Sequence, residues 1–208
     1  NVRDMKLFEG DSGIYATFNS GHPESSLDSN RIYVSRVDSL HSPMEVVVSD
    51  RKRVEKNWGF FFVGSELWAI YSVNPLVLLK QFKVNNQVIH MRQEYRGKKR
   101  FAAPISIGSQ PVVDNGILRF SVHLKPSISK LRVYIPKIAK LHLGSKEVRF
   151  SRPILPFRHS SIAPSRWNLF ALSVNYASGF AKWGNDYLIG FGQADHKAKF
   201  GRLFKDDN

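Results

Sequence analysis

The sequence repeats one short pattern four times, a tight turn followed by a run of mainly apolar residues. The four runs occupy residues 13–18, 66–71, 116–123 and 186–191. The equivalent positions Phe18, Tyr71, Val122 and Phe191 are about 50 to 70 residues apart, and β-rich units of roughly 50 residues are typical of propeller blades. The sequence therefore predicts an all-β fold, a β-propeller with about four visible blades.

Each repeat extends into a predicted antiparallel sheet, with approximate blade limits 1–50, 51–100, 101–166 and 167–208 in a single domain. The predicted strands are 4–9, 14–19 and 31–38, then 58–63, 66–72 and 77–84, then 107–113, 116–124 and 131–135, then 169–180, 186–191 and 199–204. A basic insert, 136–166, is predicted before the last blade, and no long helix is predicted. Since propellers close into rings and the chain starts inside a strand, we expect a five-bladed ring with an N-terminal part missing.

Composition narrows the choice of partners. The formal net charge is +14, which favours phosphate or another anion, although a solvated basic surface is an equal alternative. The chain has no cysteine, which excludes a disulfide framework and thiolate metal sites and favours a cytoplasmic location. No apolar run approaches the ~20 residues of a membrane span, and the histidines lack metal-ligand spacing.

The propeller topology predicts which polar residues meet. The starts of the inner strands and the ends of the second strands emerge on one face of a ring, so their side chains should line one axial pocket. The alternative is that they cap strand ends and turns. The predicted set is Arg3, Asp4, Lys6, Asn19, His22, Lys56, Asn57, Trp58, Asn74, Ser109, Gln110, His123, Asn175, Gln193 and Asp195.

Four phrases of this set resemble a known family. Arg3-Asp4-Met5-Lys6 is similar to a Glu-Asp-Pro-Arg strand, Lys56-Asn57 to a Lys-Asn strand, Gly108-Ser109-Gln110-Pro111 to Gly-Thr-Pro-Pro, and Gly192-Gln193-Ala194-Asp195 to Gly-x-Ala-Asp. Their order matches as well, over most of the chain. The chain thus resembles the five-bladed propellers of glycoside hydrolase family 130, the β-mannoside phosphorylases and their relatives.

The resemblance implies roles for individual residues. Asp4 matches the general acid, and a carboxyl group beside a sugar can protonate the leaving oxygen. The expected phosphate-binding residues are Lys6, Lys56 and His123. The expected substrate-binding residues are Asn19, Asn57, Trp58, Ser109 and Asp195. The chain departs from the pattern where it carries Arg3, Met5, Lys6 and Val112, and lysine in place of arginine loses a bidentate fork.

Two classes of function follow from the sequence. The first is a carbohydrate-active enzyme, a glycoside phosphorylase, a glycosidase or a glycosyltransferase-like relative, which acts on a glycan and can use inorganic phosphate as co-substrate. The second is a noncatalytic propeller that binds a glycan or another polyanion through its basic surface. Neither class needs a metal or an organic cofactor, and nucleic acid is not expected as a partner.

Overall fold

The computed structural model describes residues 2–21, 30–40, 42–52, 55–128, 131–154, 173–193 and 197–204. These residues form β-strands and one short 3₁₀ helix, η1 (Val37–Ser39). The chain divides into two compact units, Asn1–Ser72 with Leu76–Gly97, and Val73–Pro75 with Lys98–Asn208. In the described part of the chain no helix has the length and apolar character needed to cross a membrane.

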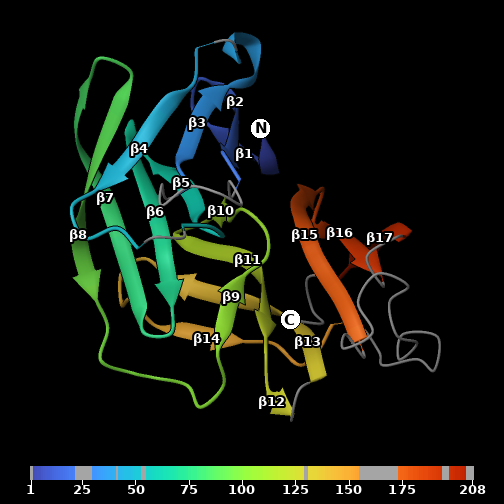
Figure 1. Ribbon diagram of the computed structural model, residues 1–208. Helices are drawn as coiled ribbons and strands as arrows, with labels where there is room; N and C mark the ends of the chain where they lie inside the picture. The colour runs from blue at the N-terminus through green and yellow to red at the C-terminus, as the bar shows by residue number, and fades with distance from the viewer. Residues whose placement is uncertain are drawn as a thin grey trace. The chain divides into compact units, whose positions relative to one another are not determined.

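The first unit begins with a four-stranded antiparallel meander. Its strands are β1 (Arg3–Gly10), β2 (Gly13–Asn19), β3 (Ile32–Arg36) and β4 (Met44–Val48), and each pairs with the next (Figure 1). The β1–β2 turn ends at Gly13, whose φ of 131° is open to glycine and strained for other residues. This meander has the strand order of one propeller blade.

A second meander completes the first unit. It contains β5 (Gly59–Val63), β6 (Glu66–Val73), β7 (Leu76–Asn85) and β8 (Val88–Arg96). The last strands of the two meanders, β4 and β8, lie side by side and pair in parallel (Figure 1). Outer strands of successive meanders point the same way, so their contact is parallel although every pair inside a meander is antiparallel. The sequence-based expectation of purely antiparallel pairing was wrong at this edge.

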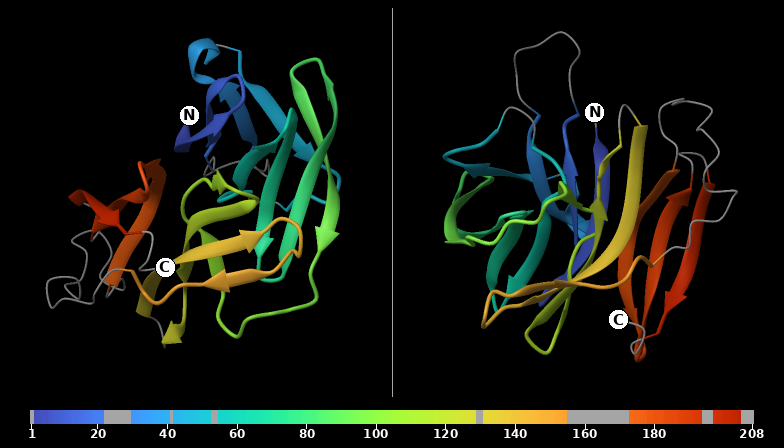
Figure 2. Two further views of the ribbon diagram at one scale, coloured as in Figure 1. Left: turned by 180° about the vertical axis from the view of Figure 1, so that it is seen from behind. Right: turned by 90° about the horizontal axis from the view of Figure 1, so that it is seen from below.

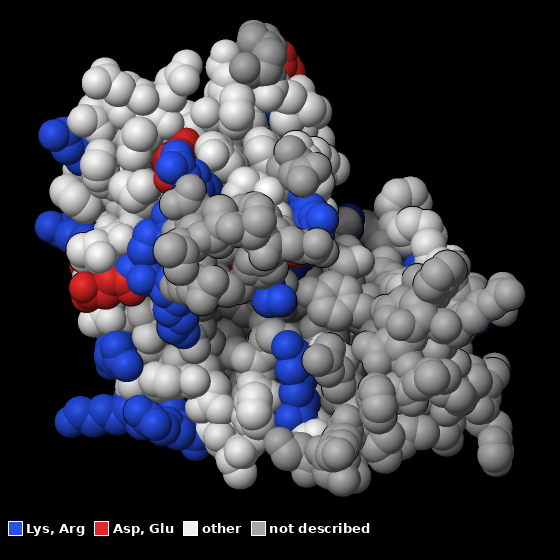
Figure 3. Space-filling model, in the orientation of Figure 1, with Lys and Arg blue, Asp and Glu red and all other residues white. Residues whose placement is uncertain are grey.

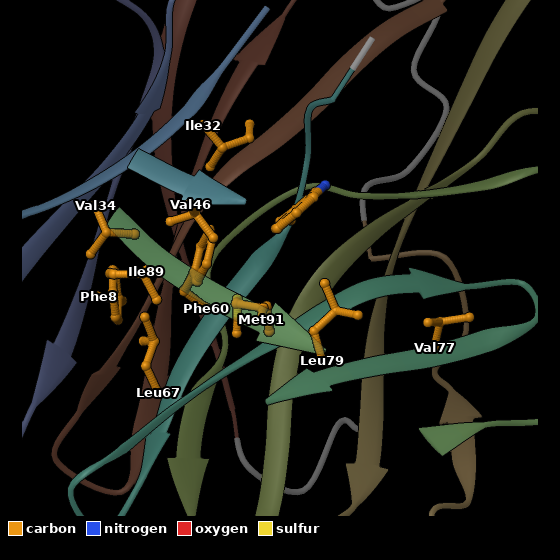
Figure 4. Packing of buried hydrophobic residues seen from close by; sticks show 12 residues of the cluster. Phe8, Ile32, Val34, Val46, Phe60, Leu67, Val77, Leu79, Ile89 and Met91 are labelled. Carbon is orange, nitrogen blue, oxygen red and sulfur yellow. The ribbon is translucent and has the colours of Figure 1, made fainter. Parts of the chain in front are cut away.

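The core of the first unit lies between its two meanders. Buried side chains come from both sheets, including Phe8 of β1, Phe60 of β5 and Met91 of β8 (Figure 4). The Phe8 and Phe60 rings are stacked with centroids 6.0 Å apart. Because a fully buried side chain of this size contributes about 1.5–3 kcal/mol, this core gives each meander a reason to hold its register against the other.

The second unit holds two more sheets. The first contains β9 (Ile105–Ile107), β10 (Val112–Asp114), β11 (Ile117–Leu124), β12 (Ser127–Ile128), β13 (Leu131–His142) and β14 (Val148–Phe150). The second contains β15 (Ser173–Trp183), β16 (Asp186–Gln193) and β17 (Lys197–Leu203), visible in red in Figure 2. The sheets join where β13 pairs with β15 in parallel, again between neighbouring blades.

The inner strand of the third blade is interrupted. Both β9 and β10 pair with β11, and residues 108–111 run between them. The gap therefore keeps four residues of the predicted Gly-Ser-Gln-Pro phrase out of the ladder and next to β11.

Most predicted strand pairs are confirmed, and one segment is corrected. The predicted hairpins around the turns at Gly13, Gly64, Gly116 and Gly184 are present. The predicted basic insert is wrong for residues 136–150, since β13 continues to His142 and β14 pairs with it. Buried Ile138, Ala139 and Leu141 stand between its lysines, which explains the strand. Residues 155–166 lie outside the described part, and the blade limits stay a prediction.

Candidate functional site

Asp4 lies on a bulge at the start of the first blade. Arg3 pairs with Asn19 and Lys6 with Thr17, so β1 has one more residue than β2 across this stretch. Asp4 itself has φ of 52°, in the left-handed region, where a non-glycine residue is strained. A bulge of this kind redirects a side chain away from the regular alternation of the strand. The Asp4 side chain is exposed.

The Asp4 carboxylate accepts a hydrogen bond from the end of the neighbouring strand. Asn19 Nδ2 donates to Asp4 Oδ2 over 2.9 Å, and Asn19 Oδ1 accepts from the backbone N–H of Gly21 over 2.9 Å. Asn19 is buried, with 4% of its surface exposed. Both ends of the amide are thus engaged, one by the carboxylate and one by the loop.

Lys6 brings a buried amine to the same strand. Its Nζ is buried and has no hydrogen-bond partner among the described residues. Burial lowers the pKa of Lys6 to about 8, and the negative charge of Asp4 opposes this fall. An ammonium in this position lacks both water and a counter-ion in contact, so an anion that reached it would gain a strong charge-assisted hydrogen bond.

The second blade begins with Lys56, Asn57 and Trp58, which meet different environments. Lys56 is exposed, and Asn57 is half-buried with φ of 61°. Trp58 packs in the core of the first unit and its Nε1 donates to Glu55 Oε2 over 3.1 Å. Both Asp4 and Asn57 therefore have left-handed backbone at the start of an inner strand.

Glu55 anchors this second entry, and the sequence gave no motif for it. Its carboxylate accepts from Trp58, from the backbone N–H of Lys52, and from Tyr71 Oη over 3.0 Å. Its own N–H donates to Asn30 Oδ1 over 2.7 Å. Burial, followed by the charge and hydrogen bond of Glu55, raises the pKa of Tyr71 to about 12. The only signal was an acid three residues before a tryptophan at a strand start.

Ser109 and His123 are fully buried in the second unit. Ser109 Oγ accepts from the N–H of Ser121 over 2.9 Å, and Ser121 Oγ donates to Ala177 O over 2.8 Å. His123 Nε2 accepts from the N–H of Ala177 over 2.9 Å. A ring nitrogen that accepts carries no proton, so His123 is here the neutral Nδ1–H tautomer.

The backbone around His123 is packed without room for another atom. A Cβ on Gly108 would lie 2.3 Å from Ala177 O and 2.5 Å from His123 Cε1. The His123 ring stacks on Tyr176 with centroids 4.2 Å apart. The Gly-Ser-Gln-Pro phrase thus joins β11 to β15 through close backbone approach, an interaction in which glycine is required.

A second polar cluster in the same unit joins four strands. Asp114 accepts from Lys182 Nζ over 3.0 Å, from Tyr187 Oη over 3.2 Å and from Arg119 over 3.2 Å. The hydrogen bond from Lys182, the first of several causes, holds the pKa of Asp114 below its usual range. Since the carboxylate is occupied by three donors, it serves the contact between β10, β11, β15 and β16.

The structure brings together part of the predicted set. Asp4, Lys6 and Asn19 form one group in the first unit, and Ser109 and His123 form another in the second. Asp195 and His22 lie outside the described residues, as do the side chains of Asn175 and Gln193. The assignment of any of these residues to substrate or phosphate, and their meeting on one axial face, stay predictions.

Basic side chains dominate the face drawn in Figure 3. Among the described residues on that face, Lys and Arg outnumber Asp and Glu, in keeping with 31 Lys and Arg against 17 Asp and Glu in the sequence. The net charge therefore reaches the surface of the described part of the chain.

Comparison with known proteins identifies the fold. No protein-family model and no curated protein sequence matches the chain. Among solved structures, the β-1,2-mannobiose phosphorylase of Listeria innocua matches with a TM-score of 0.66 and 13% identity, over 99% of this chain and 58% of that one. A glycosyl hydrolase of Bacteroides ovatus matches with a TM-score of 0.67 and 11% identity, over 99% and 65%.

A third structure extends the comparison. It comes from the GH130 family of mannoside phosphorylases, which contains glycoside hydrolases that target β-1,2-mannosidic linkages in Candida mannan, and it matches with a TM-score of 0.63 and 11% identity, over 99% of this chain and 66% of that one. Such low identity shows the fold alone. The chain is an all-β protein with the β-propeller fold, and it spans about two thirds or less of these three chains.

Proposed function

We propose that this propeller is a glycoside phosphorylase or hydrolase that acts on a β-mannoside, with Asp4 as the general acid. The observation that carries the proposal is the group at the start of β1, where an exposed carboxyl group on a strained bulge has a buried amine two residues away. Strained backbone of this kind is concentrated at functional sites because the surrounding structure must hold it in place. The fold of the mannoside phosphorylases supports the choice of substrate.

The reaction needs one proton donor and one nucleophile. The Asp4 carboxyl group gives its proton to the glycosidic oxygen as the bond from that oxygen to the anomeric carbon breaks. Phosphate, or water in a hydrolase, attacks the anomeric carbon from the opposite face, which inverts its configuration. The proton that the nucleophile loses returns Asp4 to its acid form, so that the products are an alcohol and a sugar phosphate or free sugar.

Lys6 is proposed as a phosphate ligand. Its buried ammonium has no hydrogen-bond partner among the described residues, and phosphate would supply both a charge and an acceptor. Lys56 is exposed at the start of the second blade and is proposed for the same role. His123 could contribute only through Nδ1–H, because Nε2 is engaged by Ala177.

The proposed sugar contacts differ in their accessibility. Asn57 is half-buried at an inner-strand start, the position that suits a hydroxyl ligand best. Trp58 and Ser109 are buried and engaged in protein hydrogen bonds, so a role for them requires that the sugar meet a neighbouring backbone group instead. Asp195 keeps its proposed role on the strength of the Gly-x-Ala-Asp phrase.

The test is an assay of β-1,2-mannobiose with and without inorganic phosphate, followed by proton NMR of the anomeric signals. A phosphorylase gives α-mannose 1-phosphate only when phosphate is present, whereas a hydrolase gives free mannose in both samples. If a panel of mannosides shows no phosphorolysis, hydrolysis or transfer, the enzyme proposal fails. Glycan binding without turnover would then favour the noncatalytic module, which the net charge of +14 suits if the glycan is anionic.

A further inference from the structure

The amide of Asn19 can point in only one direction. Gly21 N–H is a donor and nothing else, so the Asn19 atom that faces it must be the carbonyl oxygen, which accepts over 2.9 Å. The amide nitrogen is thereby turned toward Asp4 Oδ2, also at 2.9 Å. The usual ambiguity between the oxygen and nitrogen of an asparagine side chain is removed by this partner.

The loop that holds the amide is itself fixed. Gly21 has φ of 75°, a value that favours glycine, and a Cβ at this position would lie 2.9 Å from Arg3 Cδ and Nε. Ser20 Oγ accepts from the N–H of Arg31 over 2.9 Å, which ties the same loop to the next strand. Asn19 is buried between these contacts, so the amide cannot rotate without breaking the loop.

The fixed amide distinguishes the two oxygens of Asp4. In a protonated carboxyl group one oxygen accepts and the other carries the proton. Asn19 Nδ2 can only donate, so Oδ2 is the accepting oxygen and the proton belongs to Oδ1. Among the described residues, Asn19 is the only hydrogen-bond partner of the Asp4 side chain, which leaves no second group to reverse this assignment.

We propose that Asn19 is a positioning residue for Asp4, which reserves Oδ2 as an acceptor and so makes Oδ1 the oxygen that transfers the proton. This inference rests on the proposed role of Asp4 as general acid. It replaces a direct contact of Asn19 with substrate by an indirect role. It also explains why a strained φ of 52° persists, since the hydrogen bond to Asn19 secures the carboxyl group on the bulge.

The test uses Asn19→Asp, which keeps the oxygen that accepts from Gly21 and replaces the donor to Asp4 by a second carboxylate oxygen. Two carboxylates in contact hold a shared proton to higher pH. We therefore expect the alkaline limb of the kcat/KM profile to move up by about one pH unit or more, while KM for the glycan changes less than about threefold. Ser20→Ala, in the same loop without a contact to Asp4, should leave the limb in place.

Two results would overturn the inference. An unmoved limb with a raised KM would make Asn19 a direct substrate ligand, and an unmoved limb with unchanged KM would make it a loop anchor only. Thermal melting checks that Asn19→Asp folds; if it does not, Asn19→Ser, which also removes the donor, takes its place and should lower kcat about tenfold without a matching rise in KM.

The outcome stays separable from the proposed function. If the parent protein turns over no glycoside, the proposed function fails, and the pairing is measured without substrate by the ¹³C signal of the Asp4 carboxyl group, assigned with Asp4→Asn. Asn19→Asp should then shift the midpoint of that signal to higher pH and Ser20→Ala should not. An equal midpoint in all three proteins would contradict the pairing itself.

Discussion

Two inner-strand entries that look alike in sequence differ in their chemistry. At the first blade, Asp4 is exposed on a bulge and Lys6 Nζ is buried without a hydrogen-bond partner in the described part of the chain. At the third blade, Ser109 and His123 are fully buried, and the atoms described above are engaged with Ser121 and Ala177. A polar phrase at an inner-strand start can therefore supply chemistry or hold two sheets together.

The difference arises from backbone packing. The bulge at Asp4 adds a residue to β1 and turns a side chain outward. The gap between β9 and β10 does the opposite, because Gly108 lets the backbone approach Ala177 so closely that the side chains around it are enclosed. The first entry thus has the features of a site, and the third those of an interface between β11 and β15.

The largest effect on stability is expected at Gly108. Gly108→Ala would place a methyl group 2.3 Å from Ala177 O, and overpacking of this kind costs about 3 kcal/mol or more in the free energy of unfolding. Chemical denaturation measures it. Gly144→Ala is the matched control, since a Cβ there meets nothing within 4 Å. Equal stability of the two variants would break the assignment of the third entry as a packed interface.

A smaller loss is expected when His123 is replaced by phenylalanine. The substitution keeps a ring against Tyr176 but leaves the N–H of Ala177 without its acceptor, which costs about 1–3 kcal/mol. Thermal melting at several phosphate concentrations measures both effects of the change. If His123→Phe lowers stability and retains phosphate protection, the structural role holds; loss of protection alone would make His123 a phosphate ligand.

Lys6→Met is expected to stabilise the protein at pH 7. The folded pKa of about 8 lies below the model value of 10.5, so between these values the unfolded chain binds more protons and the parent gains stability as pH rises. Below pH 8 the parent bears the full cost of the buried ammonium. The advantage of Lys6→Met, on the order of 1–3 kcal/mol, should therefore be largest at pH 7 and shrink toward pH 10.

Phosphate sharpens this comparison. Phosphate should raise the melting temperature of the parent by binding its native state, and Lys6→Met should abolish the rise. Lys80→Met serves as the control, because Lys80 pairs with Glu66 over 2.9 Å and belongs to another blade. A parent that is more stable than Lys6→Met at pH 7 without phosphate would contradict the cost assigned to the buried amine.

The sequence predicted the sheets better than the site. Gly64, Gly116 and Gly184 sit in turns with positive φ, so glycine and its neighbours marked the hairpins locally. Pro136 was taken as the start of an insert, yet it lies within β13, where its partner across the ladder is His123. Alternation beyond the proline was the stronger signal, since Ile138 and Leu141 are buried.

The details of the site depend on contacts distant in sequence. The orientation of Asp4 rests on Asn19, fifteen residues away, and on a bulge that no local pattern marks. The burial of His123 rests on Ala177, 54 residues away. Residue type and strand position could indicate that both are near a blade entry, but which one is open is decided by tertiary packing.

The most direct test of the central claim is the turnover of β-mannosides by Asp4→Asn, compared with Asp11→Asn in the turn of the same hairpin. Asparagine keeps the shape of Asp4 and tolerates its left-handed backbone, but cannot give up a proton in the same way. The account predicts a loss of at least about 10²-fold in kcat for Asp4→Asn, with glycan affinity largely kept, and no loss for Asp11→Asn. Unchanged kcat in Asp4→Asn would contradict it.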